Sequence, residues 1–401
     1  YGFVPGRQID ELRLVINTVL EQAYLQKRPI ASATLDQSKC FDSYLQGCFE
    51  LASRRLALPE EWIDLDAALN EQAVTKVRFA YGLTPGFKRG RKLNSITGML
   101  EGTSQGAAQG GTDSASPKFV AVQDMINTLW EKLRTGFPVQ VSARQGIILS
   151  GGAFADDQKL LVESTREATE WMQYQGDNAI LNGITNRKEK CAGSAIEYDE
   201  NGERKEIENI APIELLMGDE ARPEPIPMVH PEDSIKFLGE KSSLALYWSD
   251  AVKDAKKKAD EVLGYFDTFL HPREAEAVWK ALLTTSIVYK LKLATVSTSE
   301  LQEVVQKVFT RLKNRVKLAM GTPTKLIHAL GIGDIEADLN VERLVMLLKM
   351  LNSKYSDTKA AATAMVNEHQ RWYGGATPVL EQDNKQGKQY SGTIIERAHH
   401  F

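Results

Sequence analysis

The chain has 401 residues, of which 42% are hydrophobic and 25% are charged, and these are the proportions of a folded globular protein. Its net charge is −4, and its sequence lacks the run of roughly 18 apolar residues that a membrane-spanning helix needs, so no membrane partner is expected. The three cysteines form no CxxC pair, which excludes a disulfide framework and a cysteine-rich zinc site.

The charge is distributed unevenly along the chain. Residues 197–233 carry twelve acidic and three basic residues, a net charge of −9, which leaves +5 for the remainder. Residues 304–333 contain no Asp or Glu but six basic residues, which are Lys307, Arg311, Lys313, Arg315, Lys317 and Lys325. A basic stretch of this length inside a folded domain predicts contacts with phosphate groups.

The first half of the chain predicts helices that alternate irregularly with strands. Hydrophobic periodicity, proline positions and turn residues define these elements. Helices are expected over residues 9–27, 60–80, 116–134 and 165–177, and strands over residues 30–36, 139–143, 146–150 and on both sides of residues 155–157. This mixture predicts an α+β domain in which helices cover one face of a small antiparallel sheet.

The second half predicts a ribbon, a loop and then helices. Asn201-Gly202 is a strong hairpin signal, so the acidic segment is expected to begin as an exposed β-ribbon over residues 197–207. Residues 221–233, rich in proline and acidic residues, are expected to form a loop. The composition of residues 243–372 favours helices almost throughout, which predicts an all-helical second domain.

Carboxylates stand at two positions where strands are expected to end. Asp36 closes the early β run, and Asp156 and Asp157 occupy a tight turn between apolar strands. Adjacent acidic side chains repel each other, and a bound divalent cation relieves the repulsion; carboxylate oxygens suit Mg²⁺. An isolated Asp-Asp pair usually does no more than solvate a β-turn, so the surrounding motifs decide between the two interpretations.

Those motifs stand in the order found in reverse transcriptases. The set resembles the LINE-type enzymes of retrotransposons without long terminal repeats, and it covers residues 1–241 well and the helical remainder only loosely. The matching segments are YGFVPGRQID at 1–10, LDQSKCFDS at 35–43, GAAQGGTDSASPKF at 106–119, GAFADDQKLL at 152–161, NRKEKC at 186–191 and IKFLGEK at 235–241.

The resemblance implies an RNA-directed DNA polymerase with a palm and a thumb. The palm, with a remnant of the fingers and the acidic insert 197–233, is expected over residues 1–241, and the thumb over residues 242–372. Residues 373–401 are expected to be a poorly ordered tail. The implied partners are an RNA template, a DNA primer and deoxynucleoside triphosphates, and the implied location is intracellular and nuclear or nucleus-associated.

The resemblance also implies a catalytic centre. Asp36, Asp156 and Asp157 match the residues that hold two Mg²⁺ ions in the family, with Mn²⁺ as a possible substitute. Two cations suit phosphoryl transfer, since one lowers the pKa of the primer 3′-oxygen and the other neutralises the leaving pyrophosphate. Asp42 matches a second acidic position and is expected to cap the following helix.

Five further residues match positions around the incoming nucleotide, which are Gln37, Ser38, Phe41, Gln109 and Gly110. Phe41 would exclude a ribose 2′-hydroxyl, although a Phe in the core is the alternative interpretation. Ser104-Gln105-Gly106 offers a competing alignment for the Gln-Gly pair, and GAAQGG is preferred because it keeps the family's GxxQG order.

A lysine after Asn186 would serve the departing pyrophosphate. Lys188 and Lys190 are each one step from the usual spacing, and Lys190 is preferred. Residues Phe237, Leu238 and Gly239 match the turn that holds the primer strand, for which a plain hairpin is the alternative.

The helical domain offers a basic face for nucleic acid. Lys307, Arg311 and Arg315 follow one another at helical spacing, opposite an apolar face. In the family, the thumb grips the template–primer duplex. A merely solvated helix surface remains the alternative.

Two other functions remain open. One is a reverse-transcriptase-like scaffold that binds nucleic acid without catalysis, although three neighbouring acidic residues argue against it. The other is an RNA-dependent RNA polymerase, against which Ala155 and Phe41 speak. The chain opens at the GFxxGR block, so the basic residues of the fingers are expected upstream, and the fragment by itself is expected to polymerise poorly.

Overall fold

The structure is a computed structural model, and it divides the chain into two compact units. The sheet unit comprises residues 1–12, 29–137 and 150–228, and the helical unit comprises residues 13–28, 138–149 and 229–401. The residues that the structure describes are 7–38, 45–72, 74, 78–79, 82–83, 85, 92–93, 100–101, 135–154, 157–182, 184–217, 222–264, 271–294, 296, 298–319, 321–323 and 333–373.

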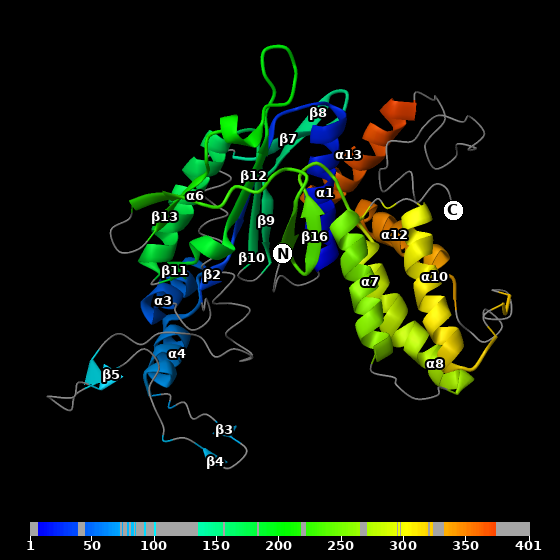
Figure 1. The fold of residues 1–401 in the computed structure, drawn as a ribbon. Helices are drawn as coiled ribbons and strands as arrows, with labels where there is room; N and C mark the ends of the chain where they lie inside the picture. Colours follow the sequence, from blue (N-terminus) through cyan, green and yellow to red (C-terminus); the bar gives the residue numbers. More distant parts are fainter. Residues whose placement is uncertain are drawn as a thin grey trace. The chain divides into compact units, whose positions relative to one another are not determined.

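A four-stranded antiparallel sheet forms the centre of the sheet unit (Figure 1). Its spatial order is β12-β1-β10-β9, so the early strand β1 lies between two strands from much later in the chain. The bounds are β1 Ile30–Leu35, β9 Gly151–Phe154, β10 Asp157–Val162 and β12 Ala192–Ile196. Strands β1, β9 and β10 coincide with predicted strands, whereas β12 was not predicted. The pairing of β9 with β10 confirms the predicted hairpin around residues 155–157.

Helix α6 (Thr165–Leu181) covers one face of this sheet, and its N-terminus is defined by Ser164, whose side chain accepts a hydrogen bond from the Glu167 amide. Trp171 and Met172 are buried against alternate residues of the strands. The Gln175 amide donates to Gln158 of β10 at 2.6 Å in the interior, which ties helix to sheet. The predicted helix over residues 165–177 is therefore confirmed and extends one turn further.

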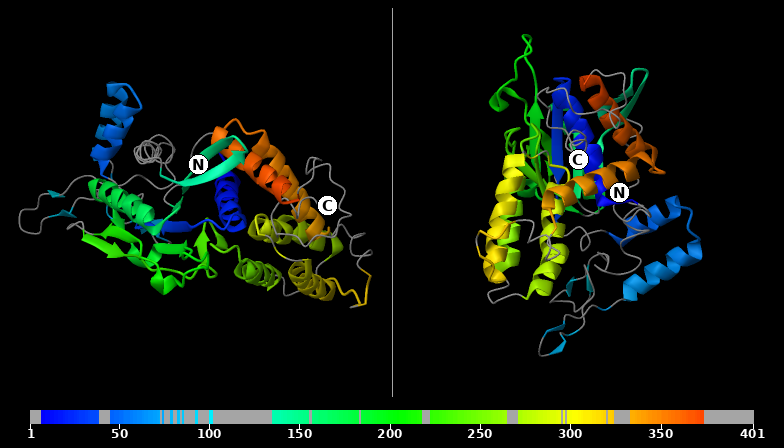
Figure 2. Two further views of the ribbon diagram at one scale, coloured as in Figure 1. Left: turned by 90° about the horizontal axis from the view of Figure 1, so that it is seen from above. Right: turned by 90° about the vertical axis from the view of Figure 1, so that its right-hand side faces the viewer.

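The remaining elements of the sheet unit are short. Helices α3 and α4 pack against each other as a pair (Figure 2). The bounds are β2 Gln37–Ser38, α3 Gln46–Arg55, α4 Glu60–Gln72, β3 Arg78–Phe79, β4 Gly82–Leu83, β5 Lys92–Leu93, β6 Leu100–Glu101, β11 Thr185–Asn186, η2 Lys188–Lys190, η3 Ile207–Asn209, β13 Glu214–Met217 and β14 Arg222–Pro225.

Two local predictions need correction. The helix predicted to run to residue 80 ends at Gln72, and residues 78–79 form a strand, because the β-branched residues that follow Gln72 disfavour helix. The predicted loop at 221–233 begins instead with β14, an exposed edge strand paired with β13. Pro223 and Pro225 are two positions apart in β14, so the two residues that lack an N–H face the same edge of the strand. An edge strand needs no hydrogen-bond donor on its unpaired edge.

The acidic ribbon is shorter than predicted. Its two arms are joined by one isolated antiparallel β-bridge, between Tyr198 and Arg204, and they form no longer strand pair. The Asp199 carboxylate accepts hydrogen bonds from the amides of Asn201 and Glu203, which closes the turn at the predicted position. These side-chain bonds compete with a longer ladder.

The helical unit is built on the chain from Val229 onward, together with most of α1 and a hairpin of β7 and β8. The bounds are α1 Ile9–Leu25, β7 Phe137–Ser142, β8 Gln145–Leu149, β15 Ser234–Phe237, β16 Glu240–Ser243, α7 Ser249–Gly264, α8 Pro272–Val278, η4 Trp279–Thr284, α9 Thr285–Leu291, α10 Thr298–Arg315, α12 Ile335–Leu351 and α13 Ser356–Tyr373. Gln22 of α1 pairs with the backbone of Gln140 in both directions, at 2.9 Å, which fixes the hairpin.

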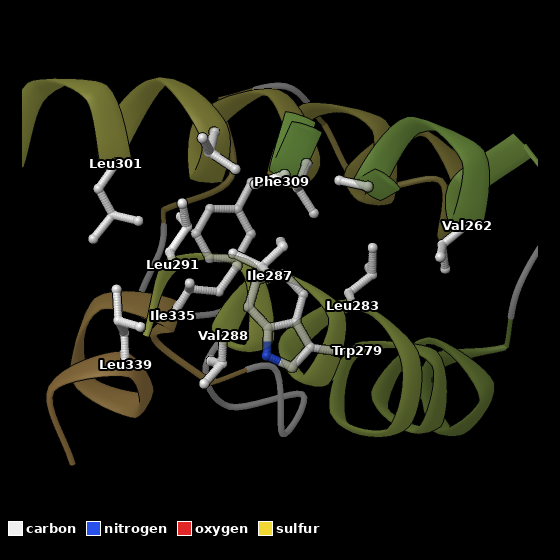
Figure 3. Packing of buried hydrophobic residues seen from close by; sticks show 14 of the residues in the cluster. Val262, Trp279, Leu283, Ile287, Val288, Leu291, Leu301, Phe309, Ile335 and Leu339 are labelled. Atoms are coloured by element: carbon white, nitrogen blue, oxygen red, sulfur yellow. The ribbon is translucent and has the colours of Figure 1, made fainter. Parts of the chain in front are cut away.

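One hydrophobic cluster holds α7, α9 and α10 together (Figure 3). Trp279 and Phe309 stack at its centre, with ring centroids 5.0 Å apart. Ile287, Leu291 and Leu339 surround them and are fully buried. Burying each such side chain contributes about 1.5–3 kcal/mol, so this cluster is the principal source of stability in the unit.

The structure confirms a mixed fold of small antiparallel sheets and several helices. Among the described residues, no helix is both long enough and apolar enough to cross a lipid bilayer. The helix predicted over residues 116–134 lies outside the described residues, as does the tail predicted over residues 373–401 apart from Tyr373, which ends α13. The assignment of residues 1–241 and 242–372 as palm and thumb stays a prediction.

Candidate active site

Asp36 stands immediately after β1, which has a neighbouring strand on each side. The side chains of β1 alternate between two faces, and Ala31, Ala33 and Leu35 point into the core beneath α6. Asp36 therefore belongs to the opposite face. Its side chain is 36% exposed, so the carboxylate is open to solvent while its backbone is held by the sheet.

The register of β1 and β10 bears on how Asp36 and Asp157 lie. Leu35 pairs with Gln158, the last pair of the ladder, so continuing the register by one position would set Asp36 opposite Asp157. Directly opposed residues of antiparallel strands have side chains on the same face, with Cβ atoms about 4.5–5.5 Å apart. The register therefore predicts that two of the three carboxylates lie close together.

Lys190 reaches Asp36 from the other side. In the ladder of β1 and β12, Thr34 pairs with Ala192, and Lys190 precedes that strand by two residues. Its Nζ lies 3.3 Å from both carboxylate oxygens of Asp36. The backbone agrees with this arrangement, because the Arg187 amide donates to the Asp36 carbonyl at 3.4 Å.

The other candidate lysine points elsewhere. Lys188 opens the 3₁₀ turn η2, and its Nζ contacts Glu224 of β14 at 3.0 Å. Residues two apart in such a turn project in different directions. Lys190 is thus the one that lies beside Asp36, whereas the sequence spacing alone left both open.

The neighbouring Cys191 is chemically inert. Burial raises the pKa of its thiol to about 11, so the thiol stays protonated near neutral pH. A reactive or metal-binding cysteine needs the thiolate form. Asp36, Asp157 and Lys190 are therefore the candidate residues for chemistry at this corner.

Asp36 and Asp157 have the hard oxygen atoms that Mg²⁺ prefers, and they lie on one solvent-accessible face, so their chemistry fits a divalent cation. Asp156, the third predicted ligand, lies outside the described residues. Within the described part of the chain, no group of three or more His, Cys, Asp or Glu side chains forms a possible metal site. The metal assignment stays a prediction.

The predicted nucleotide-binding residues are only partly described. Gln37 and Ser38 form β2, which pairs with Asn186 and Thr185 of β11. Gln37 and Ser38 directly follow Asp36 in the sequence, so this short ladder starts next to that residue. Phe41, Gln109 and Gly110 lie outside the described residues, as does Asp42.

The predicted primer-binding turn is a two-residue hairpin loop in the helical unit. Phe237 pairs with Glu240 at the ends of β15 and β16. Leu238 and Gly239 both have positive φ, 50° and 76°, which suits the tight turn favoured by hairpins. The Phe237 and Leu238 side chains are buried. Gly239 alone in this turn is partly exposed.

The predicted basic face lies on α10. Val304, Val308 and Leu312 are buried on its apolar side, as the periodicity predicts. Arg311 is exposed, and its guanidinium contacts Asp260 of α7 at 3.2 Å. Arg315 is half-buried, and the Lys307 side chain lies outside what the structure describes. Arg311 is thus the clearest exposed cation of the predicted set.

Sequence reasoning missed the residues that fix the primer-binding turn. Tyr289 and Lys290 of α9 contact its two carbonyl groups, although they lie about fifty residues away in the sequence. Nothing in the local sequence indicates this, since a Tyr-Lys pair on a helix is commonplace.

No protein-family model matches the sequence, and no curated protein matches it. The solved structures to which the chain is similar include three telomerase structures. Telomerase from Candida albicans in complex with a TWJ fragment of telomeric RNA is 12% identical, with a TM-score of 0.34 over 90% of this chain and 52% of that chain. Apo telomerase from Candida tropicalis is 10% identical, with a TM-score of 0.35 and coverages of 90% and 51%.

Telomerase from Candida tropicalis in complex with a TWJ fragment of telomeric RNA is 12% identical, with a TM-score of 0.28 over 88% of this chain and 51% of that chain. The chain therefore spans about half the length of these telomerases. A likeness at these TM-scores carries no inference about the function of this chain.

Proposed function

We propose that this chain is the palm and thumb portion of a LINE-type reverse transcriptase, which extends a DNA primer on an RNA template. One observation carries the proposal. The ladder of β1 and β10 ends with Leu35 opposite Gln158, and its continuation would set Asp36 opposite Asp157, which come from two separate motifs 121 positions apart in the sequence. An acidic pair that only solvated a β-turn would not require a second carboxylate on the neighbouring strand.

Asp36, Asp157 and the adjacent Asp156 would hold two Mg²⁺ ions, with Mn²⁺ as a substitute. When bound, these ions supply Lewis acidity toward the primer 3′-oxygen and the phosphates of the incoming nucleotide. The protein's own contribution is the geometry, because both carboxylates are attached to strands whose register is set by the buried ladder behind them.

Lys190 provides a positive charge at the same corner. Its ammonium group pairs with Asp36 in the structure, and near a triphosphate it would donate to the departing pyrophosphate. Gln37, Ser38, Phe41, Gln109 and Gly110 would line the nucleotide, and Phe41 would exclude a 2′-hydroxyl. Deoxynucleoside triphosphates, an RNA template and a DNA primer are the proposed partners, with an intracellular and nuclear or nucleus-associated location.

Primer extension by the intact protein tests the proposal. Asp36→Asn and Asp156→Asn should each lower extension more than about 100-fold, because each removes one metal-binding charge while conserving shape. Asp64→Asn, on the exposed surface of α4, is the matched control and should extend like the wild type. Binding of an RNA–DNA hybrid and thermal stability should change little in all three.

Extension by either active-site variant at more than a few percent of the wild-type rate would contradict the assignment. A wild-type protein that binds the hybrid but never extends the primer would favour the non-catalytic scaffold instead. Preference for ribonucleotides in the wild type would favour an RNA polymerase.

A further inference from the structure

The turn between β15 and β16 adopts a conformation that its sequence does not favour. Both loop residues have positive φ, and Leu238 is the first of them. A side chain with a Cβ is strained in the left-handed region, where glycine or asparagine is usual. Leu238 is nevertheless buried. Contacts from elsewhere in the helical unit must therefore hold the turn in this form.

Two neighbouring residues of α9 provide those contacts. The Tyr289 hydroxyl donates a hydrogen bond to the Leu238 carbonyl at 2.8 Å. The Lys290 ammonium donates to the Gly239 carbonyl, which is the next one along the turn. Both carbonyls of the loop are thereby fastened to a single helix.

A buried arginine holds Tyr289 and the start of β16 together. The Arg13 guanidinium lies 4.8 Å from the centre of the Tyr289 ring and donates to the Tyr289 carbonyl at 3.1 Å. Its Nε donates to the Glu240 carboxylate at 2.6 Å. Glu240 is the residue immediately after the turn. Arg13 and Glu240 side chains are only 2% and 8% exposed, so the pair is rigidly enclosed.

The second strand of the hairpin is attached to α7 as well. Lys241 pairs with Asp254 at 3.1 Å, and Lys290 lies 3.8 Å from the same carboxylate. Asp254 thus connects α7, α9 and β16. The turn is fixed by side chains from α1, α7 and α9, all within the helical unit.

We propose that Tyr289 and Lys290 are positioning residues for the primer strand: they fix the Leu238-Gly239 turn, whose partly exposed Gly239 backbone bears on the primer. The inference rests on the proposed function and deepens it. Because a displacement of about 1 Å at a reacting centre lowers the rate of a positioned reaction by about two orders of magnitude, a loosened turn affects chemistry more than binding.

The test compares Tyr289→Phe, Lys290→Met and their combination in the intact protein. Tyr289→Phe removes one hydroxyl and keeps the ring over which Arg13 stacks. Lys290→Met keeps the length of the side chain without its donor. Tyr247→Phe and Lys359→Met, at exposed positions of the same unit, remove the same groups away from the turn and serve as controls.

We expect the kcat of single-nucleotide extension to fall about tenfold or more in the double variant and less in each single variant. The KM for the nucleotide and the Kd for an RNA–DNA hybrid should stay within about twofold of the wild type. Lys290→Arg, which keeps a donor, should recover most of the rate. The assays run well below the melting temperature of every variant, which is measured alongside.

Extension rates equal to those of the two controls would overturn the inference while leaving the proposed function standing. A fall in kcat that follows only the loss of folded protein, with no recovery by Lys290→Arg, would likewise overturn it. A wild-type protein without primer extension would remove the proposed function and the inference together. If the double variant does not fold, the two single variants decide by the same criteria.

Discussion

Asp36 and Lys190 form an ion pair across the end of β1, with the lysine Nζ 3.3 Å from both carboxylate oxygens. The two side chains are 36% and 49% exposed, so the pair contributes little to stability. The ion pair matters because the lysine competes with a metal ion for Asp36. A cation bound by Asp36 would have to share the carboxylate with the ammonium group or displace that group.

Lys190→Met should therefore tighten the binding of Mn²⁺ at this site by about 2–5-fold, since an exposed ion pair is worth about 0.2–1 kcal/mol. Titration calorimetry or Mn²⁺ spectroscopy measures it in the absence of nucleotide. The same variant should extend primers more slowly. Lys188→Met, which removes a lysine paired with Glu224 instead, should leave metal affinity unchanged. Equal or weaker binding in Lys190→Met would refute the competition.

Phe41→Val should lower the preference for deoxynucleotides over ribonucleotides by about 10–100-fold, because a smaller side chain no longer meets the 2′-hydroxyl. The ratio of kcat/KM values for the two sugars is the measurement. Phe49→Val provides the control, since Phe49 is fully buried in α3 and should affect stability without affecting the ratio. An unchanged ratio in Phe41→Val would make Phe41 a core residue.

Replacement of Lys307, Arg311 and Arg315 by Gln should flatten the dependence of log affinity on log salt for an RNA–DNA hybrid by roughly 2–3 units, because each phosphate contact releases counterions. The loss should be similar for every sequence. Because Arg311 contacts Asp260, Asp260→Asn should tighten binding by about 2–5-fold. The control replaces Lys349, Lys354 and Lys359 by Gln and should leave the slope at its wild-type value. If the two triple variants have the same slope, the duplex binds elsewhere.

Glu167 makes stability depend on pH. Burial raises the pKa of its carboxyl group, which exceeds the lowering effect of the hydrogen bonds from the Gly136 and Glu163 amides. A raised pKa in the folded state means that the protonated form is favoured by folding. The associated stability is therefore present at low pH and is lost as the pH rises from the unfolded-state pKa, near 4.5, through the folded-state value.

Urea unfolding of the wild type and Glu167→Gln across pH 4–7 checks this. The wild type should lose stability relative to the variant as the pH rises, because Gln cannot ionise. Glu170→Gln, an exposed neighbour on the same helix, should give a smaller change. A constant difference between the wild type and Glu167→Gln across this range would contradict the sign.

The elements of the central sheet could be predicted because their signals are local. Apolar runs bounded by turn residues identify β1, β9 and β10, and Ser164 marks the start of α6. The pairing of these strands is not local, and only the order of the motifs suggested that Asp36 and Asp157 meet. The choice between Lys188 and Lys190 depended on a single 3₁₀ turn, which spacing in the sequence does not encode.

Other failures follow from weak or tertiary signals. Proline favours a loop assignment, so β14 was missed; an edge strand tolerates proline on its unpaired side. The bonds from Tyr289 and Lys290 to the Leu238-Gly239 turn depend on tertiary packing, and no periodicity reveals them. The glycine at position 176, inside the confirmed helix, also reflects tertiary packing, because a Cβ there would lie 2.5 Å from the Leu216 side chain of β13.

The position of β1 between β10 and β12 has a consequence for biosynthesis. Residues 30–35 leave the ribosome early, whereas their partners at 157–162 and 192–196 follow more than a hundred residues later. Until then, both edges of this apolar strand are unsatisfied and open to pairing with other chains. Such long-range pairing folds slowly. The nascent chain should therefore depend on chaperones during this interval, and chains truncated before residue 157 should aggregate.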